Sequence, residues 1–202
     1  MALCDYLKRT RRLRKILILG SGTVGKSSLL KVLKENKSLS EMDPSYRKYK
    51  RTPFLELDTI DVSRMKNNTN GVFQLYDVAG QLDMPIHAIR DFANTILNNT
   101  DLVILMFASD NPQSLYDLNK WIRLVEKYYK KFSRIKKPYY LLLRNKIDLN
   151  GSLDPILSLK FRDKDKRIIE YFEISCLTYE GISKLKEWLI NYLFLMGKIN
   201  LT

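Results

Sequence analysis

Apolar residues recur along the chain in short blocks that predict strands and helices in alternation. Residues 15–19 form a short apolar run that stops at Gly20, which is typical of a strand buried on both faces. A helix should follow over residues 26–35, because its leucines recur at helical spacing. The leucines expected to face inward are Leu29, Leu30 and Leu33.

The next apolar blocks predict a hairpin. Residues 53–62 and 72–76 are typical of two strands, and the segment between them, residues 66–71, is rich in turn-forming residues. Such a hairpin would place one antiparallel strand in the sheet.

Further along the chain the alternation continues. Asp83 can cap a helix, residues 102–107 predict another buried strand, and Pro112 suits the first turn of a long helix. The inward positions would be Ile86, Ile89, Phe92, Ala93, Ile96 and Leu97 in the first of these helices, and Leu115, Leu118, Ile122, Val125 and Tyr129 in the second.

Two more strands are expected over residues 139–143 and 168–174, and a last helix over residues 181–196. Strands that are joined through helices run parallel, with helices on both faces of the sheet. The pattern therefore predicts an α/β fold with a mostly parallel sheet.

Composition excludes several classes of protein. A chain of 202 residues with 45% hydrophobic content can bury one good core, and no apolar run approaches the roughly 18 residues that span a bilayer. Two cysteines, Cys4 and Cys176, cannot build a disulfide framework, which favours a reducing cytosol. The single histidine, His87, argues against zinc sites and histidine-based catalysis.

The net charge of +13 implies attraction to something anionic: a nucleotide, a nucleic acid or an acidic membrane face. Basic residues cluster at positions 8–15, 47–51 and 127–137, although each cluster can also be a solvated face without a partner. We expect a basic N-terminal extension over residues 1–13, followed by a single domain over residues 14–202.

One motif carries most of the chemistry. The segment from Gly20 to Ser27 follows a predicted strand and opens a predicted helix, which is the arrangement of a phosphate-binding loop. Its glycines let backbone N–H groups point at phosphates, and the helix N-terminus adds its dipole. Lys26 is placed to reach the β- and γ-phosphates, and the Ser27 hydroxyl to ligate Mg²⁺.

A second motif selects the base. Asn145, Lys146 and Asp148 lie just past the predicted strand 139–143. The Asp148 carboxylate can accept hydrogen bonds from guanine N1–H and the 2-amino group, whereas adenine would leave it unpaired. Asn145 would tie the loops together, and Lys146 would lie along the base.

A third motif ends the strand that begins near Val72. Asp77 can hold a Mg²⁺-bound water, the Gly80 N–H can sense the γ-phosphate, and Gln81 is placed to orient an attacking water.

Together these residues resemble the small GTPases of the Ras superfamily, over about residues 14–196. The resemblance implies the P-loop GTPase fold, with a six-stranded sheet, five main helices and two switch loops. It implies GTP or GDP with Mg²⁺ as ligands, slow hydrolysis, and activating, exchange and effector proteins as partners. Gly22 lies where such proteins tolerate little side chain, consistent with a site open to an external arginine.

The resemblance assigns the site residues. It implies that Gln81 and Lys26 are catalytic and that Ser27 and Asp77 hold the metal with a switch residue, for which hairpin symmetry favours Thr52. It implies that the nucleotide is bound by Gly20, Ser21, Gly22, Thr23, Val24, Gly25, Lys26, Ser27, Ser28, Gly80, Asn145, Lys146, Asp148, Ser175, Cys176 and Leu177.

Three departures from the family pattern stand out. The base-closing motif, usually Ser-Ala-Lys, is Ser-Cys-Leu at residues 175–177, so nucleotide affinity is expected to be lower. The metal-binding switch residue can be Ser45 by Ras-like spacing, Thr59 by similarity to Rag-type GTPases, or Thr52, which hairpin symmetry favours. The segment of residues 81–101 is several residues longer than in Ras, which again favours Rag-like or other divergent members of the superfamily.

Two functions fit this pattern. The first is a GTP-hydrolysing switch, and the second is a nucleotide-loaded interaction subunit, similar to a Rag partner, with little hydrolysis. A nucleic-acid binder and a nucleoside kinase fit less well, because no stacking module supports the former and the base motif contradicts the latter. We expect a cytosolic protein with weak, salt-sensitive membrane contact through residues 8–15.

Overall fold

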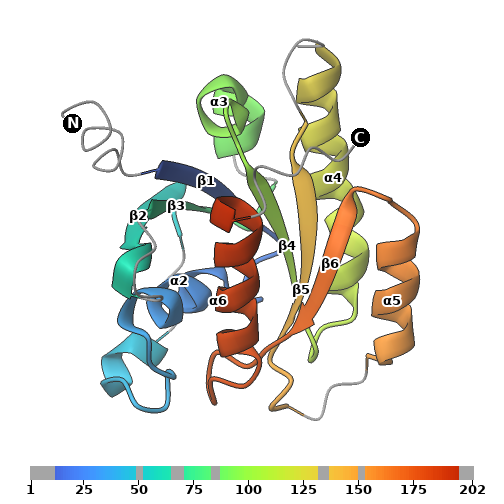
Figure 1. Cartoon of the computed structure of the whole chain (residues 1–202). Helices are drawn as coiled ribbons and strands as arrows, with labels where there is room; N and C mark the ends of the chain where they lie inside the picture. The colour runs from blue at the N-terminus through green and yellow to red at the C-terminus, as the bar shows by residue number, and fades with distance from the viewer. Residues whose placement is uncertain are drawn as a thin grey trace, which may run out of the picture.

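Strands from both halves of the chain form one central sheet, drawn in Figure 1. The computed structural model describes residues 12–48, 52–64, 71–82, 87–131, 137–149 and 153–195. Within this part, six strands lie in the order β2-β3-β1-β4-β5-β6. Their bounds are Arg12–Leu19 (β1), Leu55–Asp61 (β2), Gly71–Val78 (β3), Leu102–Ala108 (β4), Tyr139–Asn145 (β5) and Ile168–Glu173 (β6). Only β2 pairs antiparallel, with β3, and the other pairs are parallel.

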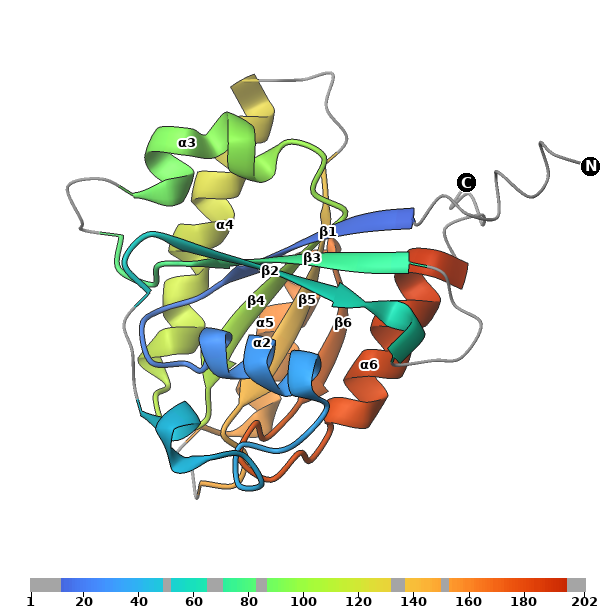
Figure 2. The same cartoon turned by 90° about the vertical axis from the view of Figure 1, so that its left-hand side faces the viewer.

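Five α-helices in the described residues cover both faces of the sheet (Figures 1 and 2). Helices α2 and α6 pack on one face, and α3, α4 and α5 pack on the other. The α-helices are Lys26–Glu35 (α2), Ala88–Leu97 (α3), Gln113–Lys131 (α4), Pro155–Asp163 (α5) and Ile182–Ile190 (α6). Short turns of other helix types are Pro44–Arg47 (η1), Val62–Arg64 (η2) and Asn191–Leu195 (η3). The α/β fold that the sequence predicted is confirmed.

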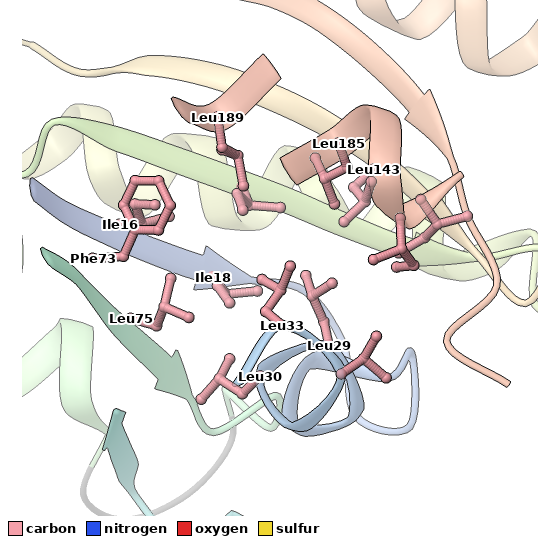
Figure 3. Close-up of a cluster of buried hydrophobic side chains, with 14 of the residues drawn as sticks. Ile16, Ile18, Leu29, Leu30, Leu33, Phe73, Leu75, Leu143, Leu185 and Leu189 are labelled. Carbon is pink, nitrogen blue, oxygen red and sulfur yellow. The ribbon is translucent and has the colours of Figure 1, made fainter. Parts of the chain in front are cut away.

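Strand β1 lies inside the sheet and is covered by helices on both of its faces. Ile16 and Ile18 point into the layer under α2 and α6, while Leu17 and Leu19 point to the opposite layer, and all four are fully buried. Figure 3 shows Ile16 and Ile18 among the leucines of α2 and α6. A parallel strand buried on both faces needs a continuous apolar run, which is what residues 16–19 supply.

Several element boundaries differ from the predicted ones. Strand β1 begins at Arg12 rather than at residue 15, because residues 12–18 pair with β3. The last helix ends at Ile190 and passes into η3, short of residue 196. Of the predicted hairpin turn over residues 66–71, residues 66–70 lie outside the described residues, and Gly71 is the first residue of β3. Helix α5 has no counterpart in the apolar pattern.

Helix α3 begins later than predicted. Its N-cap is His87, and Asp83 and Ile86, predicted for its start, lie outside the described residues. Phe92 was expected to face inward, but this was wrong, since its side chain is 50% exposed. The backbone at Phe92 is not helical (φ −126°, ψ 32°), and this kink turns the ring outward onto the edge of Phe54.

Helix α4 follows the prediction more closely. Its buried face includes Leu115, Leu118, Val125 and Tyr129, as expected, whereas Ile122 is only partly buried. No helix among the described residues is both long and apolar enough to cross a membrane.

Candidate functional site

The carboxyl ends of the parallel strands meet at one edge of the sheet, where the structure has a cavity of about 340 Å³. Segments that follow β1, β3, β5 and β6 contribute to its wall, which is where open α/β sheets bind ligands. The predicted site residues that line it are Gly22, Thr23, Gly25, Lys26, Ser27, Ser28, Thr52, Gly80, Gln81, Asn145, Lys146, Asp148, Cys176 and Leu177. Gly20, Ser21, Val24, Asp77 and Ser175 were also predicted and do not line the cavity directly.

The loop between β1 and α2 is shaped to receive an anion. Gly25, the N-cap of α2, has φ +101°, and a Cβ there would lie 2.2 Å from Asn145 Nδ2. Only glycine satisfies both limits. The N-terminal amides of α2 therefore open onto the cavity, and a helix N-terminus attracts anions.

Lys26 brings a buried cation to this loop. Its Nζ donates to the carbonyl oxygens of Gly20 at 2.9 Å and Ser21 at 3.0 Å. Burial lowers the pKa of the Lys26 ammonium, and the nearby Asp77 carboxylate partly offsets this. A phosphate would supply the negative partner that a buried ammonium lacks.

Three oxygen-bearing side chains gather beside Lys26. The Asp77 Oδ2 accepts from Ser27 Oγ at 2.5 Å and from Thr52 Oγ1 at 3.3 Å, and the two hydroxyls lie 3.2 Å apart. Asp77 is fully buried, and its Oδ1 has no hydrogen-bond partner among the described residues. Burial raises the pKa of Asp77, against the effect of Lys26. A buried, unpaired oxygen beside two hydroxyls fits the oxygen-ligand preference of Mg²⁺.

The other candidates for the switch position lie elsewhere. Ser45 is exposed in η1, where its N–H donates to Asp43 Oδ1 at 2.8 Å. Thr59 is exposed within β2 opposite Gln74, three positions along from the Glu56–Asp77 pair. Of the three candidates, only Thr52 contacts Asp77.

Asn145 ties the base side of the cavity to the phosphate loop. Its Nδ2 donates to Val24 O at 2.9 Å, and its Oδ1 accepts from the Cys176 N–H at 3.2 Å. Cys176 itself is buried, and burial raises the pKa of its thiol to about 12, so it is a packed residue without thiolate chemistry at neutral pH.

Asp148 and Lys146 lie at the far end of the cavity. Asp148 Oδ1 accepts from Ser175 Oγ at 2.5 Å, which orients the carboxylate. Lys146 adopts φ +63°, and its Nζ pairs with Asp110 Oδ2 at 2.9 Å. Leu177, where the family has lysine, is 40% exposed at the rim.

The segment after β3 lies directly on the phosphate loop. A Cβ at Gly80 would lie 2.4 Å from the Gly22 backbone nitrogen, so glycine is required for this approach. A Cβ at Gly22, in contrast, would meet nothing within 4 Å. Gln81 is exposed at the cavity wall.

With this geometry in place, comparison with known proteins decides the family. The model of the Ras family matches residues 15–194, nearly the whole described domain. The chain belongs to the Ras family. It is therefore a small GTPase, and GTPases of this family hydrolyse GTP and bind guanine nucleotide and Mg²⁺.

Relatives of this Ras-family GTPase include Rab proteins. The human Ras-related protein Rab-9A is 26% identical over 164 residues, which cover 80% of this chain and 73% of the relative. Rab-18 of Lymnaea stagnalis is 28% identical over 177 residues, covering 87% and 78%. Rab-7B of Dictyostelium discoideum is 29% identical over 148 residues, covering 70% and 62%. These are distant relationships.

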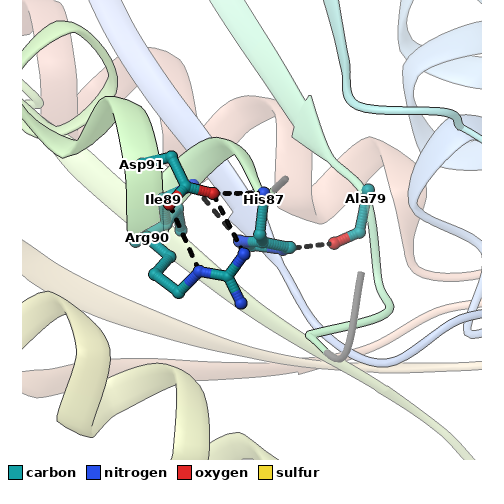
Figure 4. Close-up of polar contacts among 5 residues, drawn as sticks. All are labelled: Ala79, His87, Ile89, Arg90 and Asp91. Carbon is teal, nitrogen blue, oxygen red and sulfur yellow. Dashed lines mark hydrogen bonds and ion pairs between the residues drawn. The ribbon is translucent and has the colours of Figure 1, made fainter. Parts of the chain in front are cut away.

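The sequence did not predict the structural role of one residue of this GTPase. His87 is buried and lies between the end of β3 and the start of α3 (Figure 4). Its Nδ1 accepts from the Ile89 N–H at 3.3 Å, so its Nε2 carries the proton that is donated to Ala79 O at 3.1 Å. The His87 N–H donates to Asp91 Oδ2 at 2.6 Å. His87 thus fixes Ala79, the neighbour of Gly80, to α3, and its position just before an apolar helix was the one available signal.

The neutral state of His87 predicts a pH dependence of stability. Burial lowers the His87 pKa, and the Arg90 charge adds to this while Asp91 opposes it. The unfolded chain then binds the proton more readily, so stability falls as pH drops below about 6.5, by at most about 1.4 kcal/mol per pH unit. The free energy of unfolding, measured with urea between pH 7.5 and pH 5, should decrease more steeply with falling pH in the parent than in the variant His87→Gln. Equal pH dependence in both proteins would contradict a neutral imidazole whose two ring nitrogens are both hydrogen-bonded.

Proposed function

We propose that this chain is a molecular switch that binds GTP or GDP with Mg²⁺ and hydrolyses GTP slowly. The observation that carries the proposal is one cavity that joins Lys26 and the Ser27–Thr52–Asp77 cluster at one end to Asp148 at the other. Phosphates and a base of one nucleotide would occupy these two ends.

The phosphate end would use the chain's own charges. Lys26 would exchange its bonds to the Gly20 and Ser21 carbonyls for the β- and γ-phosphate oxygens, and the α2 amides would bind the β-phosphate. Ser27, Thr52 and Asp77 would hold Mg²⁺, whose charge offsets that of the triphosphate. A ligated metal would also satisfy the unpaired Asp77 Oδ1, directly or through water.

The base end would select guanine through Asp148. Its carboxylate is oriented by Ser175 and would accept from N1–H and the 2-amino group, which adenine does not present. Asn145 fixes the distance between this carboxylate and the phosphate loop. Leu177 contributes contact area at the rim without the charge of the usual lysine.

Hydrolysis would depend on the segment after β3. The Gly80 N–H, held against the phosphate loop, would bond the γ-phosphate, and Gln81 would orient the attacking water. The free space around Gly22 supports stabilisation by an arginine from an activating protein, so intrinsic turnover would be slow.

The cellular context of the switch stays a prediction. We propose activating, exchange and effector proteins as its partners, a cytosolic location, and weak membrane contact through residues 8–15. Part of this prediction was wrong, because Lys15 is buried in β1, where its Nζ donates to Thr95 O and Asn98 O, and Arg14 pairs with Asp101 at 3.0 Å. Residues 1–11 lie outside the described residues, so the contact would rest on the charge of residues 8–12.

Asp148→Asn tests the guanine assignment. An amide places an N–H donor against the 2-amino group of guanine, whereas xanthine presents an accepting 2-oxo group there, so affinity for GDP should fall by about two orders of magnitude or more, and affinity for xanthosine diphosphate should rise. Titration of both nucleotides and ADP against parent and variant measures this. Parent protein that binds ADP as tightly as GDP would refute guanine selection.

Thr52→Ala tests the metal ligand. Losing this hydroxyl should raise the Mg²⁺ concentration for half-maximal GTP binding about tenfold, which is about 1.4 kcal/mol. Ser45→Ala and Thr59→Ala are matched controls and should stay within about twofold of the parent. A larger effect in either control would move the assignment to that residue.

Gln81→Leu separates the switch from the interaction subunit. The GTP dissociation constant should stay within about threefold, while single-turnover hydrolysis slows about tenfold or more, because a misplaced water costs rate without ground-state contacts. Rates are measured with and without cell extract. If the parent shows no GTP hydrolysis under either condition, the interaction-subunit function is favoured. If the parent and Gln81→Leu hydrolyse GTP at equal rates, Gln81 does not take part in the mechanism.

A further inference from the structure

A second cavity, of about 350 Å³, lies between the start of α3 and the middle of α4. Its more buried wall consists of Leu82, His87 and Leu124, and its exposed wall consists of the cations Arg90, Lys120, Arg123 and Lys127. We call it the α3–α4 cavity. The volume lies within the range of ligand sites, about 300–1,000 Å³. It is separate from the nucleotide cavity, with which it shares no lining residue.

The cations of α4 form a row. Lys120, Arg123 and Lys127 lie at positions i, i+3 and i+7, which places them on one helix face. Leu124, at i+4, lies on the same face. Seven residues of α-helix span about 10 Å. A single carboxylate or phosphate group can contact only part of such a row.

The carboxylates around the cavity neutralise only part of its positive charge. Arg90 pairs with Asp91 at 3.2 Å, and Lys120 pairs with Asp117 at 2.8 Å. The remaining carboxylate of this stretch of α4, Glu126, pairs with Arg167 on another side of the helix. Within the part of the chain that the structure describes, Arg123 and Lys127 form no ion pair. Among the described residues that line it, the cavity therefore has an excess of positive charge.

We propose that the α3–α4 cavity docks an acidic, partly apolar segment of a partner protein. Its carboxylates lie along Arg123 and Lys127, and an apolar side chain packs on Leu82 and Leu124. Charge complementarity supports this occupant: the Arg123 guanidinium matches a carboxylate bidentately, and spaced carboxylates match the row.

The same cavity adjoins the segment after β3. Leu82 follows Gln81 directly, and His87 holds Ala79. An occupant that contacts Leu82 and His87 therefore favours one arrangement of this segment. If the proposed nucleotide switch holds, docking and the bound nucleotide are coupled, and each changes the affinity of the other by the same factor.

The test is an NMR titration of the full-length ¹⁵N-labelled protein with a synthetic helical peptide. The peptide carries glutamates at i, i+4 and i+7 and leucines between them, and its control has glutamine for every glutamate. Amide shifts should map to the start of α3 and to residues 120–127. The glutamine peptide should bind the parent protein with an affinity at least about tenfold lower than that of the acidic peptide. The acidic peptide should lose affinity by about the same factor for the variant Arg123→Glu/Lys127→Glu. Lys160→Glu/Lys164→Glu makes the same charge change in α5 and at its C-cap, and this variant should bind the acidic peptide within about twofold of the parent.

Each other outcome overturns the docking proposal. Amide shifts that map to another part of the protein would refute the site. The site would also be refuted if the variant Arg123→Glu/Lys127→Glu, with an unchanged melting temperature, bound the acidic peptide as tightly as the parent does. Displacement of the peptide by an equal concentration of inorganic phosphate would assign a small-anion site. Binding of phosphatidylserine vesicles lost in that variant, with no peptide binding, would assign a lipid surface.

The coupling is read separately, as the peptide's effect on the GDP dissociation rate. A change of about threefold or more is expected. If the chain bound no guanine nucleotide, the peptide titration would still decide the docking site, so the two proposals fail independently.

Discussion

The buried carboxylate of Asp77 is the group around which the phosphate end of the site is arranged. A fully buried charge is costly unless it is paired. Among the described residues, the Asp77 carboxylate has two hydroxyls on one oxygen, no hydrogen-bond partner on the other, and the Lys26 ammonium nearby. Strand β3 carries it, α2 brings Ser27 and Lys26, and the segment before β2 brings Thr52. Three parts of the chain are thus held together by one incompletely satisfied acid. A site of this kind is stabilised when a cation and a phosphate enter it.

The opposite end of the cavity has a neutral tie instead. The Asn145 amide bonds the phosphate loop with its nitrogen and the segment after β6 with its oxygen. Because β5 and β1 are separated in the sheet by β4, this side chain spans the loops of non-adjacent strands. It ties the base pocket to the phosphate loop. Among the described residues, the segment after β3 is held by the close approach of Gly80 to the phosphate loop, by the Ala79 N–H that donates to Phe54 O at 3.0 Å, and by His87. In the proposed switch, this segment is the part of the site that would respond to the γ-phosphate.

Sequence reasoning succeeded where local chemistry determines the structure. The apolar run of β1 and the glycine-rich loop after it could be predicted, since burial on both faces and a positive φ at Gly25 restrict the residues allowed. Helix α5 could not, because Ile156, Leu157 and Leu159 are largely exposed and leave no regular apolar face. Phe92 was misplaced because a backbone kink, invisible in periodicity, rotates it outward.

Contacts between distant segments were the least predictable. Thr52 was favoured by hairpin symmetry, yet it lies three residues before β2 and reaches Asp77 through its loop, so the reason was only partly right. The roles of His87 and of the cations on α4 depend on the packing of α3 against α4, which no motif encodes. The two cavities meet in one short segment: Gly80 and Gln81 face the nucleotide cavity, and Leu82 faces the other. Because consecutive residues cannot move independently, an occupant of one cavity would restrict the positions available in the other if both proposals hold. Such a connection depends on the tertiary structure, since it arises from which cavity each of these neighbouring residues lines.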